Sequence, residues 1–328
     1  MEPEPVPGPT EDRQPLPGSF RILDVLSRWW GYIPAAIPLA LTIAVVAALV
    51  VTSKLQNFGW SFFGFVFANY GVGIFVLGSF LTSVPALVFA MVIGLGIAIS
   101  SATYLPKILS AWMDPFVDLL AGIPSIVYGI WGYFVAAPFF GAHVFRAAAV
   151  HLAWIPGFAP TATASLPIIT TGDGLAMAII ILTLMILPIT TVLMRDSLKA
   201  VPRDLWESGL ALGATRWEVN RRVAIPYAKR GIWGAAFLGF GRAIGETVAV
   251  FMVIDQAEKI PTNVFDGTST MASLIIGTFD SALELNPSAQ VYLHWLAELA
   301  LVLMAVTLLV NVGGRWLIRQ TYTEVAGL

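Results

Sequence analysis

The sequence has 328 residues, of which 57% are hydrophobic and 12% are charged, and its mean hydropathy is +0.80. This composition excludes an ordinary soluble domain and indicates a membrane protein. The formal net charge of -2 gives no basic bias toward nucleic acid, and a chain with no cysteine and three histidines cannot build disulfides, thiolate chemistry or Cys/His metal sites. We therefore expect no nucleic-acid partner, no metal and no cofactor.

The N-terminal stretch differs in composition from the remainder of the chain. Residues 1–18 hold six prolines and four acids, without an apolar pattern that could bury one face. We predict a disordered, proline-rich cytoplasmic tail and lead-in over residues 1–30, followed by one transmembrane domain over residues 31–328.

Six stretches match the roughly 20 apolar residues that a helix needs to cross the hydrocarbon core of a bilayer. The fold is therefore predicted to be all-α, a polytopic membrane bundle of six transmembrane helices, with both chain termini on the same side of the membrane. The predicted spans are Ile33–Val51, Phe75–Ile99, Ile123–Phe140, Leu175–Leu193, Ile232–Ile254 and Val291–Val312.

The basic residues are distributed unequally between the two sides of this predicted bundle. Of the 18 lysines and arginines, 14 lie on the side of the termini, and Arg242 lies within the fifth span. Only Lys54, Arg146 and Lys259 lie on the opposite side. By the positive-inside rule both termini are cytoplasmic, and the chain is a multi-pass protein of the inner (plasma) membrane.

The loop between the fourth and fifth spans, residues 195–230, carries eight basic residues and local helix signals. Gly213 stands where a helix end requires a positive φ, and Thr215 with Glu218 forms a capping-box pattern that begins a second helix. Pro226 is predicted to close that helix. The pattern favours a compact unit that docks a soluble partner, and the alternative is a basic loop that simply lies on anionic lipid.

The same loop resembles the EAA signature of ABC importer permeases, and the residues that carry the resemblance are Glu207, Ser208, Gly209, Gly213, Val223, Ile225 and Pro226. The resemblance implies that Glu207, Gly213, Thr215, Glu218 and Pro226 couple the membrane helices to ATP-driven closure of an ATPase subunit. The chain has no P-loop sequence of its own, so it is not expected to be an enzyme and the ATPase is a separate chain.

Three further segments look like phosphate-importer permeases of the PstC type, and they are Leu120–Gly132, Gly241–Thr247 and Leu296–Leu303. This resemblance implies a type I importer permease with inorganic phosphate as substrate. It also implies three partners, namely two copies of a soluble ATP-binding subunit, a second, PstA-like permease and an extracytoplasmic phosphate-binding protein.

Charged residues within the predicted spans are candidates for the substrate pathway, because a charge at the bilayer centre is costly unless it faces water or a partner. Arg242 can offer forked donors to an oxyanion, and Glu246 can accept a hydrogen bond from the P–OH group of hydrogen phosphate, which sulfate lacks. The alternative is that these two residues neutralise each other as an i, i+4 pair. Glu298 in the sixth span is a further candidate, with a structural acid as its alternative.

Other functions remain open at this point. An importer of molybdate, sulfate or phosphonate would share most of these features. A proton-coupled secondary transporter would show paired broken helices in internal repeats, and a membrane-embedded hydrolase would show a catalytic constellation within the spans. Neither pattern is evident in the sequence, and no catalytic residue is predicted.

Overall fold

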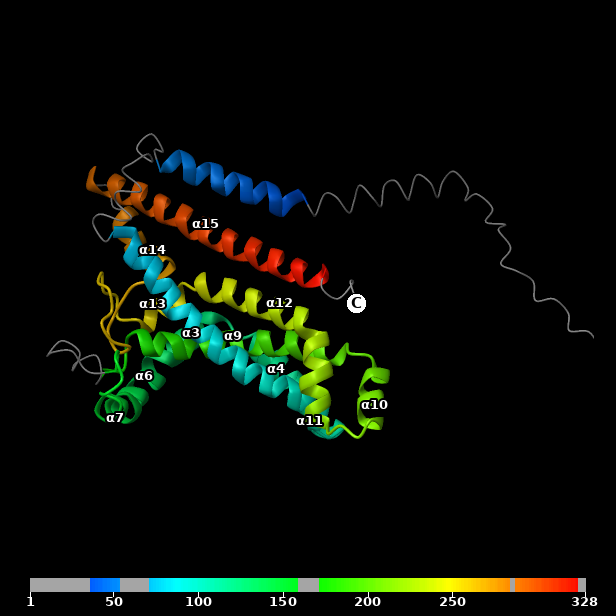
Figure 1. Cartoon of the computed structure of the whole chain (residues 1–328). Helices are drawn as coiled ribbons and strands as arrows, with labels where there is room; N and C mark the ends of the chain where they lie inside the picture. The colour runs from blue at the N-terminus through cyan, green and yellow to red at the C-terminus, as the bar shows by residue number, and fades with distance from the viewer. Residues whose placement is uncertain (1–35, 54–70, 159–170, 284–286, 324–328) are drawn as a thin grey trace, which may run out of the picture. The chain divides into compact units, whose positions relative to one another are not determined.

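The computed structural model describes residues 36–53, 71–158, 171–283 and 287–323 (Figure 1). The chain divides into two units, Met1–Val51 and Thr52–Leu328. A helix over Ala36–Thr52 accounts for the described part of the first unit and corresponds to the first predicted span. The predicted tail, residues 1–30, lies outside the described residues.

Every regular element described in the second unit is helical. In chain order the elements are α3 (Gly71–Ile99), η2 (Ser100–Tyr104), α4 (Lys107–Ala121), α5 (Ser125–Trp131), η3 (Gly132–Ala136), α6 (Ala137–Phe140), η4 (Gly141–Phe145), α7 (Arg146–His151), α9 (Leu175–Lys199), α10 (Arg203–Ala211), α11 (Arg216–Val219), η5 (Asn220–Ala224), α12 (Ile225–Ile244), α13 (Val248–Val253), α14 (Met271–Leu283) and α15 (Pro287–Thr323). The η elements are short π-helical segments within longer helices.

Four described helical segments are long and apolar enough to cross a bilayer. They are Val72–Tyr104, Ser125–His151, Leu175–Lys199 and Leu293–Trp316, and they correspond to the second, third, fourth and sixth predicted spans. The prediction of an all-α polytopic membrane bundle is therefore confirmed.

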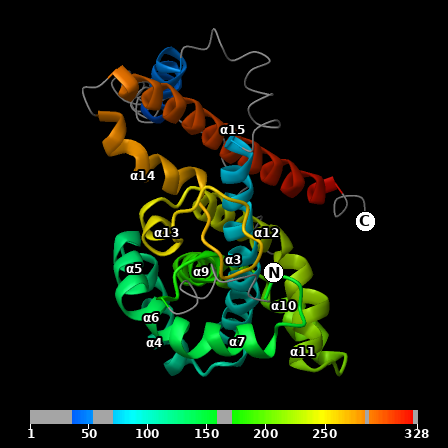
Figure 2. The same ribbon diagram turned by 90° about the vertical axis from the view of Figure 1, so that its left-hand side faces the viewer.

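Helix α9 is the centre of the second unit. It contacts α3, α4, α5, α12 and α13, and Figure 2 shows it nearly end-on among its neighbours. Its side chains Met177, Ile181, Leu182 and Ile186 are fully buried. The facing side of α3 presents small residues such as Ala86, so the two backbones approach closely, as is typical of helix pairs in membranes.

The fifth predicted span is wrong as a single continuous helix. α12 ends at Ile244, residues 245–247 are non-helical, and α13 begins at Val248. Gly245 is the C-cap residue of α12. The backbone N–H groups of Gly245 and Glu246 both donate to the carbonyl of Ala243, so the chain turns tightly here. Non-helical backbone at membrane depth is tolerated where it lies within protein or lines a cavity.

The sequence also did not predict α4 and α14. α4 is amphipathic, with an exposed apolar stripe at Ile108, Trp112 and Phe116, and its other face contacts α9. The segment between the fifth and sixth predicted spans is non-helical over residues 255–270, and its second half is buried. This segment packs into the bundle and then leads into α14.

Candidate functional site

The predicted docking loop forms two helices joined by a tight turn. α10 and α11 lie together at one end of the bundle, and the opposite end carries α7 (Figure 1). Gly213, in the turn, has a φ of 82°, which confirms the predicted positive φ. A Cβ atom at this position would meet nothing within 4 Å, so the backbone conformation, rather than crowding, demands glycine.

The predicted capping box is present at the start of α11. The Glu218 N–H donates to Thr215 Oγ1 at 3.3 Å, and the Thr215 N–H donates to Glu218 Oε2 at 2.8 Å. The backbone hydrogen bond from Thr215, followed by that from its hydroxyl, lowers the pKa of the Glu218 carboxyl. α10 begins after Pro202 without a side-chain cap. Its other end is capped at Gly213, whose N–H bonds the carbonyl of Leu210, so both helices of the loop end or begin at the predicted positions.

The departure from the EAA signature at Gly209 has a structural explanation. A Cβ atom at Gly209 would lie 2.9 Å from a methyl carbon of Val219, a buried and β-branched side chain that cannot move away easily. Glycine in place of the family's alanine thus permits α10 to lie directly against α11. The helix pair is closely packed and presents a fixed surface.

This helix pair, which we call the coupling unit (residues 203–219), has two different faces. Trp206 is partly buried and packs against the apolar cluster at the ends of α3 and α9. Leu212 and Trp217 are 89% and 53% exposed, and Glu207 is also exposed. Large apolar side chains exposed beside an acid suit a protein partner, and Trp206 instead attaches the unit to the bundle.

Pro226 does not close the second helix, contrary to the sequence prediction. The helix continues from α11 through η5 into α12, and Pro226 lies in the first turn of α12. In the π segment the Ile225 N–H bonds the carbonyl of Asn220, five residues back, and this register shift accommodates a residue that has no N–H. Arg216 and Arg242 therefore lie on one continuous helical segment, about 40 Å apart along its axis.

An ion cluster around the buried side chain of Arg195, which the sequence did not reveal, joins α4 to α9. The Arg195 side chain is 8% exposed and lies 3.2 Å from Asp114, 3.4 Å from Asp118 and 3.2 Å from Asp196. Lys199 Nζ lies 2.6 Å from Asp114. Burial would raise the pKa of Asp114, but hydrogen bonds from Lys199 and Ser101, together with the charges of Arg195 and Lys199, lower it.

Replacing Arg195 with methionine is expected to destabilise the protein, because three carboxylates then lose their shared cation. Breaking a buried pair costs about 3 to 5 kcal/mol, and we expect the lower end because Asp114 is 22% exposed. Lys199→Met is the matched control, since a partly exposed pair contributes at most about 1 kcal/mol. Thermal unfolding of the detergent-solubilised protein provides the measurement.

The pH dependence of this effect has a defined sign. Because the pKa of Asp114 is lowered when folded, its stabilisation is present above the ordinary value of 3.8 and is lost as the pH falls through the folded value. The difference in unfolding temperature between wild type and Arg195→Met should thus persist from pH 7 to pH 5 and shrink only below about pH 4. Equal unfolding temperatures at pH 7 would contradict a stabilising role for the cluster.

The structure places Arg242 in the last turn of α12 and Glu246 in the break beyond it. Among the described residues the two side chains form no ion pair, so the neutralising i, i+4 pair is not present. Arg242 is exposed, and Glu246 Oε1 accepts a hydrogen bond from the Ala249 N–H at 3.3 Å, where it caps α13. The carboxylate of Glu246 is thus held by α13, and the guanidinium of Arg242 has no ion-pair partner among the described residues.

Glu298 lies apart from this pair. α15 packs beside α12 where the amide of Asn311 approaches Gly241, with a Cβ at Gly241 placed 3.5 Å from it. Glu298 precedes Asn311 by more than three helical turns, or about 20 Å along α15. The structure therefore places Arg242 and Glu246 at the same break in the helix and leaves Glu298 at a different level of the bundle.

The family model described as "Binding-protein-dependent transport system inner membrane component" matches residues 93–321. A "Phosphate transport system permease protein PstC" from Pasteurella multocida (strain Pm70) is 36% identical over 92% of this chain and 93% of its own length. A protein with the same description from Mesorhizobium japonicum is 35% identical over 97% of this chain and 96% of its own length.

Among solved structures, one is described as a bacterial ABC transporter involved in the import of the acidic polysaccharide alginate. It aligns with a TM-score of 0.60 at 13% identity and covers 92% of this chain and 99% of its own. At this identity the match indicates a shared fold alone. The shared fold is an all-α, multi-pass bundle.

Proposed function

Because the chain belongs to the family of binding-protein-dependent transport system inner membrane components, we propose that it forms part of the membrane pathway of an ATP-driven importer of inorganic phosphate. It is a multi-pass inner-membrane protein and the non-catalytic membrane subunit of such a system. Its partners are therefore an ATPase and a binding protein. We propose further that the ATPase is present as two copies of a soluble ATP-binding subunit and that the binding protein binds phosphate. A second, PstA-like permease is proposed as the third partner.

The observation that carries the proposed pathway is the guanidinium of Arg242 at the broken end of α12, which forms no ion pair with any residue that the structure describes. A planar guanidinium offers several N–H donors in a fork that matches the oxygens of an oxyanion. The carbonyls at the end of α12 and the carboxylate of Glu246 offset its charge in the absence of substrate. An anion passing along α12 can therefore bind at Arg242 and leave again.

The carboxylate of Glu246 is proposed to make the pathway selective for phosphate over other oxyanions. Hydrogen phosphate carries a P–OH group that can donate to a carboxylate, whereas fully deprotonated sulfate offers only acceptors and is repelled. Glu246 Oε1 already accepts from the Ala249 N–H, which fixes the carboxylate and leaves its second oxygen for the substrate. Glu298 is proposed as a separate pathway residue, nearer the start of α15.

The coupling unit is proposed to pass the motion of the ATPase to the pathway. With both termini in the cytoplasm, Glu207, Gly213, Thr215, Glu218 and Pro226 lie on the cytoplasmic side, where the ATPase docks. α11, η5 and α12 form one continuous helical segment, so a tilt of the coupling unit is transmitted to Arg242 without an intervening hinge loop. ATP binding thereby shifts the equilibrium between outward-open and inward-open states.

The test of substrate class uses the purified complex and binding protein loaded with different oxyanions. We expect phosphate-loaded binding protein to stimulate ATP hydrolysis and molybdate-loaded or sulfate-loaded protein to leave it at its basal rate. Stimulation by the molybdate-loaded protein alone would assign the chain to a different oxyanion importer.

A further inference from the structure

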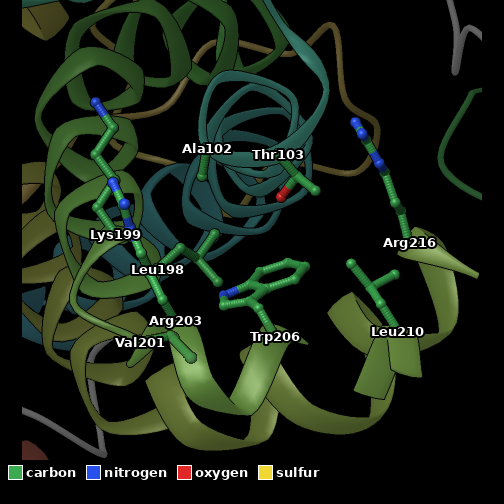
Figure 3. A pocket seen from close by; sticks show the side chains of 9 residues that line it. All are labelled: Ala102, Thr103, Leu198, Lys199, Val201, Arg203, Trp206, Leu210 and Arg216. Carbon is green, nitrogen blue, oxygen red and sulfur yellow. The ribbon is translucent and has the colours of Figure 1, made fainter. Parts of the chain in front are cut away.

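A cavity of about 720 Å³ lies between the coupling unit and the bundle. This volume falls within the range of pockets that hold small molecules. Three parts of the chain form its walls: the end of η2, the end of α9 with the residues after it, and the inner face of the coupling unit (Figure 3). The lining residues are Ala102, Thr103, Leu198, Lys199, Val201, Arg203, Trp206, Leu210 and Arg216.

Among the described residues that line the cavity, every charged one is a cation. Lys199 and Arg203 lie on one side and Arg216 on the other, with Trp206 and Thr103 between them (Figure 3). Lys199 is bound to Asp114, but Arg203 and Arg216 form no ion pair within the part of the chain that the structure describes. The cavity therefore holds a net positive charge that an anion would neutralise.

The cavity is also partly apolar and lies level with the end of a membrane span. Lys199 is the last residue of the apolar segment Leu175–Lys199, so the cavity is level with the end of a membrane span. Leu198, Val201 and the ring of Trp206 provide apolar wall, and tryptophan is typical of the interface between lipid tails and headgroups. A ligand that carries both a phosphate and hydrocarbon fits these walls better than a free anion.

Side-chain packing and a hydrogen bond between helices fix the walls of the cavity. Leu198 and Val201 are buried in the cluster that also contains Trp206. The Thr103 hydroxyl donates to Asn220 Oδ1 at 3.2 Å, which ties η2 to η5. The cavity is thus formed where the coupling unit meets the fixed end of the bundle.

We propose that this cavity binds an anionic phospholipid of the cytoplasmic leaflet, with its phosphate between Arg203 and Arg216 and its first acyl carbons against Trp206 and Leu198. The inference rests on the proposed cytoplasmic orientation of the coupling unit. The bound lipid bridges α9 and α10 and thereby holds the coupling unit in register with the bundle. Leu212 and Trp217, on the other face, stay exposed for the ATPase.

The test measures lipid binding directly, without transport. The purified complex is reconstituted in nanodiscs that contain a photoactivatable phosphatidylglycerol, and crosslinked peptides are identified by mass spectrometry. Native mass spectrometry of the same complex gives the apparent affinity for phosphatidylglycerol against phosphatidylcholine. We expect crosslinks in α10 and at the end of α9, and a preference for the anionic lipid.

The Arg203→Gln, Arg216→Gln double variant should bind phosphatidylglycerol roughly 30-fold more weakly, because each cation near an anionic headgroup contributes roughly fivefold. The matched control is Arg221→Gln with Arg222→Gln, which removes two exposed cations that do not line the cavity and should bind like wild type. Replacing Arg203 and Arg216 with lysine retains the charges and should retain binding.

Three outcomes would overturn the proposal. Equal loss of binding in the control would indicate nonspecific surface charge, and unchanged binding in the cavity variant would place the lipid elsewhere. Displacement of the lipid by inorganic phosphate would assign the cavity to a soluble anion. This experiment measures lipid binding and not transport. Its result therefore does not depend on whether the chain transports phosphate, which the ATPase assay tests separately.

Discussion

Replacing Arg242 with glutamine is expected to reduce ATP-dependent phosphate uptake about 10- to 100-fold, because a hydrogen bond to a charged group contributes about 1.5 to 3 kcal/mol. Glutamine retains length and some donors but loses the fixed positive charge. Arg242 is exposed and forms no ion pair in the described part of the chain, so its loss leaves no unpaired carboxylate. Uptake into proteoliposomes and the yield of detergent-stable complex are the two measurements.

The control for this experiment is Arg315→Gln, which removes an exposed arginine near the end of α15. It should leave both uptake and assembly close to wild type. A loss of assembled complex in Arg242→Gln equal to its loss of uptake would show that the arginine stabilises the fold and does not serve the substrate.

Replacing Gly213 with valine is expected to uncouple the importer. Gly213 has a φ of 82°, and a left-handed conformation costs a residue with a Cβ atom about 1 to 2 kcal/mol, with a β-branched residue at the upper end. The turn between α10 and α11 would therefore rearrange and displace the exposed side chains of the coupling unit. Uptake should fall about 5- to 30-fold, and ATP hydrolysis should lose its response to loaded binding protein.

Asparagine is the matched substitution at this position, because it adopts positive φ more readily than other residues with a side chain. Gly213→Asn should thus keep most of the uptake and the ATPase response. No atom lies within 4 Å of a Cβ at this position, so a clash of the Cβ atom does not explain a defect in either variant. Full stimulation of ATP hydrolysis in Gly213→Val would mean that this turn has no part in coupling.

The sequence predicted those features that depend on local rules. Hydropathy located the long spans, since a membrane helix must be apolar over its whole length. The positive φ of Gly213 and the capping box of Thr215 and Glu218 were both confirmed, because each pattern requires only neighbouring residues. The turn and the second helix of the coupling unit therefore follow from local sequence alone.

Features that depend on partners distant in sequence were not predicted. α4 lies outside the six predicted spans, and the acids Asp114 and Asp118 that it contains pair with the cation of Arg195 on α9. The spacing of Ile108, Trp112 and Phe116 was the one signal that could have identified this helix. Ion clusters between helices leave no pattern within either helix alone.

Two further predictions were wrong because the backbone hydrogen bonding differs from what the local sequence indicates. Pro226 was predicted to end a helix, but the π segment η5 changes the hydrogen-bond register just before it and lets the helix continue. The fifth span was predicted as one helix because its residues are apolar throughout, although Gly245 ends α12 within it. Hydropathy reports burial in the bilayer and does not report where a helix breaks.

The central claim is that Arg242 serves the substrate, and the double variant Arg242→Gln with Glu246→Gln tests it most directly. Glutamine at position 246 can still accept from the Ala249 N–H, so α13 keeps its cap. If the arginine binds phosphate, the double variant should assemble normally and its phosphate uptake should stay as low as in Arg242→Gln. Uptake restored to the wild-type rate would show that the two charges only neutralise each other, and it would contradict the claim.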